Sequence, residues 1–165
     1  MQTRLFQQAD IIFDFYACML HGVGRFARAL LTKGVDLYVA PAVNRMVEYG
    51  MQRSPALEWK TRQGMHVLGA STPFEFFHKM KLYTAAEISG QVQQDVLVLA
   101  TSHDHFVPLS MFYRQIEALS NVRSLTARLF TKAEQAQNHC QAGNVGLGLQ
   151  VIVTWLDQIL RRELH

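Results

Sequence analysis

Two residues of this 165-residue sequence could together carry out acid–base chemistry, namely Asp104 and His139. Asp104 lies in a short polar segment just after the apolar run 96–100, and His139 lies in a longer polar segment after residues 124–130. A carboxylate that accepts a hydrogen bond from imidazole Nδ1 fixes the tautomer of the ring, and it stabilises the imidazolium that forms when Nε2 takes up a proton. If the two side chains meet, they form a pair that can activate a nucleophile.

Each of the two residues also has a simpler explanation. Asp104 could cap the helix that we expect after Pro108, and His139 could be an ordinary loop histidine. Taken alone, either residue fits the simpler explanation better. Because each residue shortly follows a predicted strand, an acid–base pair explains their joint placement as well as the two simpler roles do.

The elements around the pair predict a parallel sheet. The run 96–100 is apolar at every position, which is typical of a strand buried on both faces. A helix over 109–119, a strand over 124–130, a polar loop over 131–144 and an amphipathic helix over 145–160 follow it. This strand–helix–strand–helix order is typical of α/β proteins, whose ligands bind at the carboxyl ends of the strands. Asp104 and His139 both follow such ends.

The first half of the chain predicts helices joined by short breaks. Thr72 to Glu75 form a capping box with proline at the first helical position, and Ser54-Pro55 is a similar start signal. Pro41 is either a kink or a boundary within its helix. The expected helices cover residues 11–20, 26–34, 35–49, 54–59 and 72–82. We therefore expect a helical region at residues 1–92 and a strand-containing region at 93–165.

The residues around the pair resemble those of the α/β-hydrolases. Asp104 stands three residues before Val107-Pro108, much as this family presents the acid of its catalytic triad after the seventh strand. Residues 138–144 (Asn-His-Cys-Gln-Ala-Gly-Asn), with 153–157 (Val-Thr-Trp-Leu-Asp) in the helix that follows, resemble the triad-histidine segment of one branch. That branch holds esterase-like and dipeptidyl-aminopeptidase-like hydrolases and the group that cleaves pseudo-oxynicotine compounds. The resemblance is specific from residue 95 to 160 and looser before it.

The resemblance implies a serine hydrolase whose small-molecule carbonyl substrate is an ester, an amide or an activated ketone. Asp104 would be the triad acid and His139 the general base. Residues 71–76 and the helices before them resemble the cap that the family inserts between its sixth and seventh strands. The expected fold class is therefore α/β. More specifically, we expect a partial α/β-hydrolase fold in which a helical cap precedes the last two parallel strands and their helices.

The sequence departs from the family at the nucleophile. The family places its serine in a Gly-x-Ser-x-Gly turn after the fifth strand, and no serine of this chain has glycines at that spacing. We therefore expect a C-terminal fragment that begins after the nucleophile and lacks the oxyanion-hole amides. Such a chain would hydrolyse nothing by itself. The alternative function is a non-catalytic interaction module that keeps the hydrolase architecture.

Other candidate sites are weaker. Cys140 could be a nucleophile, but adjacent loop residues such as Cys140 and His139 rarely face each other. His103 and His105 could join the pair in binding a metal, but a second carboxylate is missing. The glycines of 143–148 stand in the wrong order for a dinucleotide-binding turn and follow a loop and not a strand, so close helix packing explains them better. We expect no metal and no cofactor.

The aromatic residues of the helical half could line a substrate pocket or simply pack; they are Phe74, Phe76, Phe77 and Tyr83.

Composition narrows the class of protein further. Apolar residues make up 49% of the chain and charged residues 18%, which is typical of a globular protein. The net charge of +3 comes from scattered residues, so we expect no nucleic-acid partner. Two cysteines make no disulfide scaffold, and no apolar run is long enough to span a membrane. We expect a cytoplasmic protein, with a possible homo-oligomer formed through an exposed sheet edge or the cap.

Overall fold

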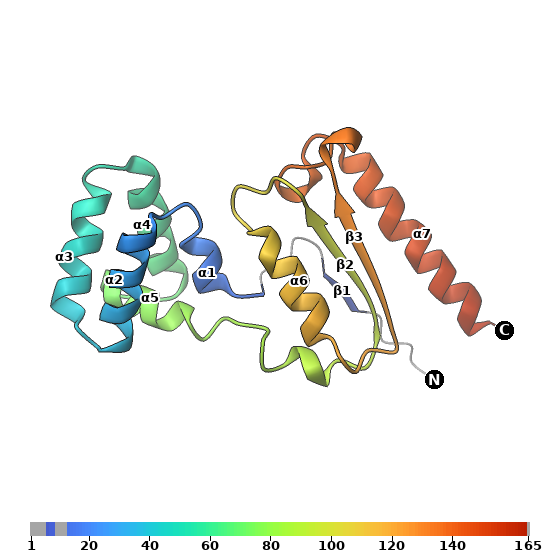
Figure 1. Ribbon diagram of the computed structural model, residues 1–165, viewed down its shortest axis with the longest axis horizontal. Coiled ribbons are helices and arrows are strands. Elements are labelled where there is room, and N and C mark those ends of the chain that lie inside the picture. Colours follow the sequence, from blue (N-terminus) through green and yellow to red (C-terminus); the bar gives the residue numbers. More distant parts are fainter. Residues whose placement is uncertain (1–5, 9–12, 165) are drawn as a thin grey trace. The chain divides into compact units, whose positions relative to one another are not determined.

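The computed structural model describes residues 6–8 and 13–164, which divide into two compact units. Residues 6–8, 13–14 and 84–164 form one unit, here called the sheet unit, and residues 15–83 form the other, the helical unit (Figure 1). The chain enters the helical unit after Asp14 and leaves it before Thr84, and these two residues pair in an isolated antiparallel bridge. The division differs from the expected boundary between residues 92 and 93, because residues 84–92 and the first strand belong to the sheet unit.

The helical unit consists of five helices, whose starts follow local sequence signals. Ser54 Oγ accepts a hydrogen bond from Leu57 N (3.2 Å), and Thr72 Oγ1 accepts one from Glu75 N (3.2 Å). Pro41 stands in the first turn of a helix and is therefore a boundary and not a kink. The helices are α1 (Phe15–Met19), α2 (Arg25–Asp36), α3 (Ala40–Met51), α4 (Pro55–Val67) and α5 (Pro73–Met80).

Two of the expected helices have different lengths in the structure. The helix expected over 11–20 is the short α1, and residues 11–12 lie outside the described part of the chain. The helix expected over 54–59 runs on to Val67, although Gly64 lies within it. A Cβ at Gly64 would lie 2.3 Å from the ring of Phe76, so the glycine allows α4 and α5 to pack closely.

The core of the helical unit explains three of the four aromatic residues that could line a substrate pocket. Phe76 and Phe77 are buried among aliphatic side chains, and Phe74 packs against the edge of this core. Tyr83 is more than half exposed. Packing therefore accounts for the two buried phenylalanines without a substrate pocket. The buried core residues are Tyr16, Leu20, Leu31, Val35, Val43, Val47, Met51, Phe76, Phe77 and Met80.

The sheet unit is built on three parallel strands in the order β1-β2-β3. The strands are β1 (Phe6–Gln8), β2 (Asp95–Thr101) and β3 (Ser124–Phe130); α6 (Leu109–Ala118) joins β2 to β3, and α7 (Val145–Glu163) follows β3. The expected parallel pair β2–β3 is confirmed, with Asp95 opposite Ser124 and Thr101 opposite Phe130. The strand β1 was missed, because three residues are too few to show an alternating or continuous apolar pattern.

Helices cover both faces of the central strand. Leu97 and Leu99 of β2 pack against Trp155 and Ile159 of α7, and the alternate residues of β2 face the other side, where α6 lies (Figure 1). This arrangement explains why the run 96–99 is apolar throughout and fully buried. Within residues 6–8 and 13–164, none of the helices combines the length and the apolar character that crossing a membrane requires.

A buried carboxylate ties the elements together at the start of β2. The Asp95 side chain is 1% exposed and forms ion pairs with Arg123 and Arg162, and it accepts a hydrogen bond from Ser124. Burial alone would raise the pKa of Asp95, but the bonds from Arg123, Arg162 and Ser124 outweigh it and hold the pKa far below its ordinary value. Through Arg162, this network joins α7 to the sheet.

Candidate active site

The structure brings Asp104 and His139 together. His139 Nδ1 lies 2.8 Å from Asp104 Oδ2, and the side chains of the two residues are 33% and 3% exposed. Asp104 comes three residues after Thr101, the last residue of β2, and His139 follows the end of β3 at Phe130. Because Thr101 and Phe130 are paired in the sheet, the two loops start side by side at the carboxyl edge.

Backbone hydrogen bonds hold the two loops against each other beyond the sheet. Ser102 N donates to Phe130 O, and His103 N donates to Gln137 O, both at 2.9 Å. The second bond joins the residue before Asp104 to a residue two positions before His139. The pair is therefore positioned by backbone hydrogen bonds between the two loops.

Asp104 also shapes its own loop. Its Oδ1 accepts hydrogen bonds from Phe106 N (2.7 Å) and Val107 N (2.9 Å), so the carboxylate closes a turn and does not cap α6. Burial alone would raise the pKa of Asp104, but the hydrogen bonds from Val107 N, from His139 and from Phe106 N outweigh it and lower the pKa. Asp104 is therefore ionised at neutral pH.

An ionised Asp104 determines which nitrogen of His139 carries hydrogen. A carboxylate only accepts hydrogen bonds, so the short contact requires that Nδ1 is the donor. In the neutral ring Nε2 then has a free lone pair. None of the described residues forms a hydrogen bond with Nε2 of His139. This arrangement leaves Nε2 able to act as a base.

Two aromatic side chains flank the imidazole of His139. The rings of His105 and Phe106 meet it edge to face, with centroids 5.7 Å and 5.8 Å away. Both belong to the loop that carries Asp104, so one turn supplies the carboxylate and the packing for the ring. From sequence, His105 was a candidate only as a metal ligand, and Phe106 had no expected role. The only sequence feature that pointed to a role for His105 and Phe106 was their position directly after Asp104.

The loop that carries His139 contains an unusual backbone. Cys140 (φ 54°) and Gln141 (φ 51°) follow His139 directly, and both lie in the left-handed region that glycine usually occupies. Each such residue costs of the order of 1 kcal/mol or more. Consecutive left-handed residues of this kind are uncommon, and they turn the chain sharply just after the imidazole. Sequence propensities gave no sign of this turn.

A close backbone approach fixes the end of the same loop. A Cβ at Gly143 would lie 2.1 Å from Gln135 O, so only glycine fits there. Asn144 donates to Glu134 O (3.0 Å) and accepts from Leu147 N (3.3 Å), which joins the loop to the start of α7. The glycine therefore serves packing, as the sequence suggested for this run.

The described residues supply no nucleophile to the pair. None of the described serine hydroxyls makes a hydrogen bond with His139, and the nearest in sequence to Asp104, Ser102 Oγ, instead lies 2.9 Å from His103 Nδ1. Cys140 is exposed in the sharp turn. A cavity beside Asp104 holds about 10 Å³, enough for a single water and too small for a substrate.

The described residues form no metal centre. Among residues 6–8 and 13–164, no three His, Cys, Asp or Glu side chains are grouped closely enough to hold an ion. His103 and His105 therefore do not form a ligand set with the pair. The site contains a buried carboxylate, an oriented imidazole and two flanking aromatic rings.

Comparisons with known proteins find no relative of this chain. A scan against models of protein families finds no match to this chain. Searches of curated proteins and of solved structures also find no match. The functional interpretation therefore depends on the geometry of Asp104 and His139 and on the residues around them.

Proposed function

We propose that this chain supplies the acid and the base of a serine α/β-hydrolase that acts on an ester, an amide or an activated ketone. The observation that carries the proposal is the 2.8 Å contact between His139 Nδ1 and Asp104 Oδ2 at the carboxyl edge of two paired parallel strands. The insertion of a helical unit between β1 and β2 agrees with the family pattern, in which a cap separates the sixth and seventh strands.

In this reaction Nε2 of His139 takes the proton of a serine hydroxyl as its oxygen attacks the substrate carbonyl. The same nitrogen returns the proton to the leaving group as its bond to the carbonyl carbon breaks, and it then takes a proton from the water that releases the acyl group from the serine. Asp104 stays ionised throughout and stabilises the imidazolium that exists between the two transfers. The serine and the oxyanion-hole amides would come from polypeptide outside this sequence, because the chain has no Gly-x-Ser-x-Gly motif. No cofactor takes part.

The test is the hydrolysis of p-nitrophenyl butyrate by the longest protein that the natural gene encodes. We expect His139→Ala and Asp104→Asn each to lower kcat by roughly 10³-fold or more. The matched control is His103→Ala in the same loop, since His103 is exposed and bonds to Ser102. The control should keep nearly full activity. Activity that survives both substitutions in the pair would contradict the proposal.

A reactive probe tests where the nucleophile lies. We expect a fluorophosphonate, which labels activated serines, to leave this 165-residue chain unlabelled and to label the longer protein upstream of it. Labelling of any serine within the chain would contradict the assignment of the nucleophile to another segment.

One observation favours the second candidate, a non-catalytic interaction module. The face of α7 that points away from the sheet exposes an apolar stripe that includes Val145, Leu149, Val153 and Leu160, each more than half exposed. Such a stripe could join two copies of the chain. A dimer that dissociates on Val153→Lys, together with no ester hydrolysis by any form of the protein, would favour this module over the hydrolase.

A further inference from the structure

The helical unit contains a groove lined by cations. Its volume is about 590 Å³, within the range of small-molecule sites, and residues of α1 and α2 form its walls. Arg25, Arg28 and Lys33 supply the charge. The hydroxyls of Tyr16 and Thr32, 3.2 Å apart, lie in the same wall and are joined by a hydrogen bond.

Most other basic side chains of the helical unit already have partners. Lys79 pairs with Glu75 at 2.6 Å, and Lys81 pairs with Asp36. In contrast, none of the three groove cations forms an ion pair with a side chain in the described part of the chain. The positive charge of the groove is therefore not neutralised by the protein itself.

The charge of the whole chain is concentrated in the same unit. Residues 15–83 contain nine lysines and arginines and four aspartates and glutamates, a net charge of +5. The rest of the chain contains seven lysines and arginines and nine aspartates and glutamates, a net charge of −2. The scattered charge seen along the sequence thus separates by unit, and an anion would be drawn to the helical unit.

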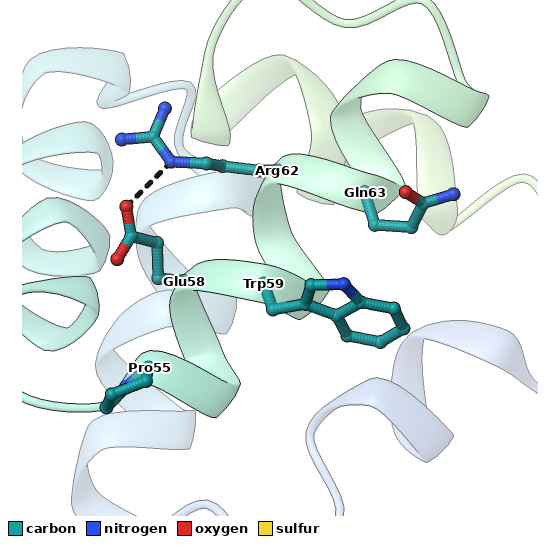
Figure 2. Close-up of a pocket in the computed structure, with 5 residues that line it drawn as sticks. All are labelled: Pro55, Glu58, Trp59, Arg62 and Gln63. Atoms are coloured by element: carbon teal, nitrogen blue, oxygen red, sulfur yellow. Dashed lines mark hydrogen bonds and ion pairs between the residues drawn. The ribbon is translucent and has the colours of Figure 1, made fainter.

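A second hollow in the helical unit provides an internal contrast (Figure 2). It has a volume of about 410 Å³ and is lined only by residues of α4. Its single cation, Arg62, points to Glu58 and lies 2.8 Å from the carboxylate. The charge of Arg62 is therefore already compensated, and this hollow has no free cation for a ligand.

We propose that the groove between α1 and α2 binds the carboxylate or phosphate group of a small amphiphilic molecule. The guanidinium groups of Arg25 and Arg28 lie one helical turn apart, where they can donate several hydrogen bonds to one anion. Leu20 gives the groove an apolar wall for the organic part of the ligand. This proposal does not depend on the hydrolase assignment.

Titration calorimetry on the full 165-residue chain tests the groove with hexyl phosphate as the ligand. Inorganic phosphate is the anion without an apolar part, and hexanol is the apolar part without an anion. We expect saturable binding of hexyl phosphate at one site, weaker binding of inorganic phosphate and none of hexanol. Raising the salt concentration should weaken the binding, because the attraction is between partly exposed charges.

Two matched variants, each losing one positive charge, locate the site. Arg28→Gln should weaken the binding of hexyl phosphate by roughly tenfold or more, whereas Arg62→Gln should change it by less than about twofold. Both side chains are exposed, so circular dichroism should show that both variants fold; if Arg28→Gln does not, Arg25→Gln replaces it. Equal loss in both variants, no saturable binding, or binding only to anionic phospholipid vesicles would overturn the proposal.

Discussion

Gly143→Ala should displace the loop that holds His139, and the structure gives the size of the effect. The new Cβ would lie 2.1 Å from Gln135 O and 3.2 Å from the carbonyl carbon of the same residue. Both are backbone atoms, so no side chain can rotate away, and the loop must move by at least about 1.3 Å to reach an ordinary contact of 3.4 Å. Overpacking of this kind costs about 1–3 kcal/mol, and a backbone obstacle places the expected loss in the free energy of unfolding near the top of that range.

Gly146→Ala is the matched control for this substitution. Gly146 lies three residues further on, within α7, and only Asn144 Oδ1 comes as near as 4.0 Å to a Cβ built there. Alanine is the better helix former, so the control should leave the free energy of unfolding unchanged or raise it by up to about 1 kcal/mol. Urea unfolding followed by circular dichroism measures both variants.

The functional consequence separates Gly143→Ala from a general loss of stability. Under the proposed hydrolase function, and where the variant is fully folded, a shift of about 1 Å between His139 and Asp104 should still lower ester hydrolysis by roughly 10²-fold. Equal stability of the Gly143→Ala and Gly146→Ala proteins, or full activity of the former, would refute this account of the loop.

Two further predictions concern the buried carboxylates. Because folding lowers the pKa of Asp95, its contribution to stability is complete above the pKa of an unfolded aspartate, about 3.9, and is lost as the pH falls toward the lower folded value. Asp95→Asn should therefore cost about 1–3 kcal/mol at pH 7 and progressively less in acid; unfolding curves with the same pH dependence as the unaltered chain would count against the network. Asp104→Ala leaves Phe106 N and Val107 N without their acceptor and should cost about 2–4 kcal/mol, whereas Asp104→Asn retains both bonds and should cost about 1 kcal/mol. Equal losses in urea unfolding would show that the turn does not depend on these bonds.

The sequence predicted the elements of the second half closely, and for a clear physical reason. Residues 96–100 are apolar throughout because helices cover both faces of β2, and Trp155 and Ile159 of α7 are apolar because they pack against Leu97 and Leu99 of that strand. The pairing of Asp104 with His139 followed from one rule, that neighbouring parallel strands end at the same edge. A strong apolar pattern and a topological rule were together sufficient to predict these elements and the contact between Asp104 and His139.

Other features of the site arise from contacts that no local pattern contains. The left-handed turn at Cys140 and Gln141 runs against the propensity of both residues, and it exists because the surrounding loop imposes it. The partnership of Arg162 with Asp95 joins residues that are 67 positions apart. The strand β1 has only three residues and is defined by its partner β2. Long-range contacts, and not propensities, decide each of these cases.

The central claim is that Asp104 holds His139 in the tautomer that leaves Nε2 free as a base. Two-bond ¹H–¹⁵N correlation spectra of the labelled chain, recorded at a pH where the ring is neutral, report which ring nitrogen carries hydrogen. In the unaltered chain we predict a protonated Nδ1 and an unprotonated Nε2. In Asp104→Asn the amide oxygen should stay on Phe106 N and Val107 N, so the amide NH₂ faces Nδ1 and hydrogen should move to Nε2. Hydrogen on Nε2 in the unaltered chain, or the same tautomer in both proteins, would contradict the account.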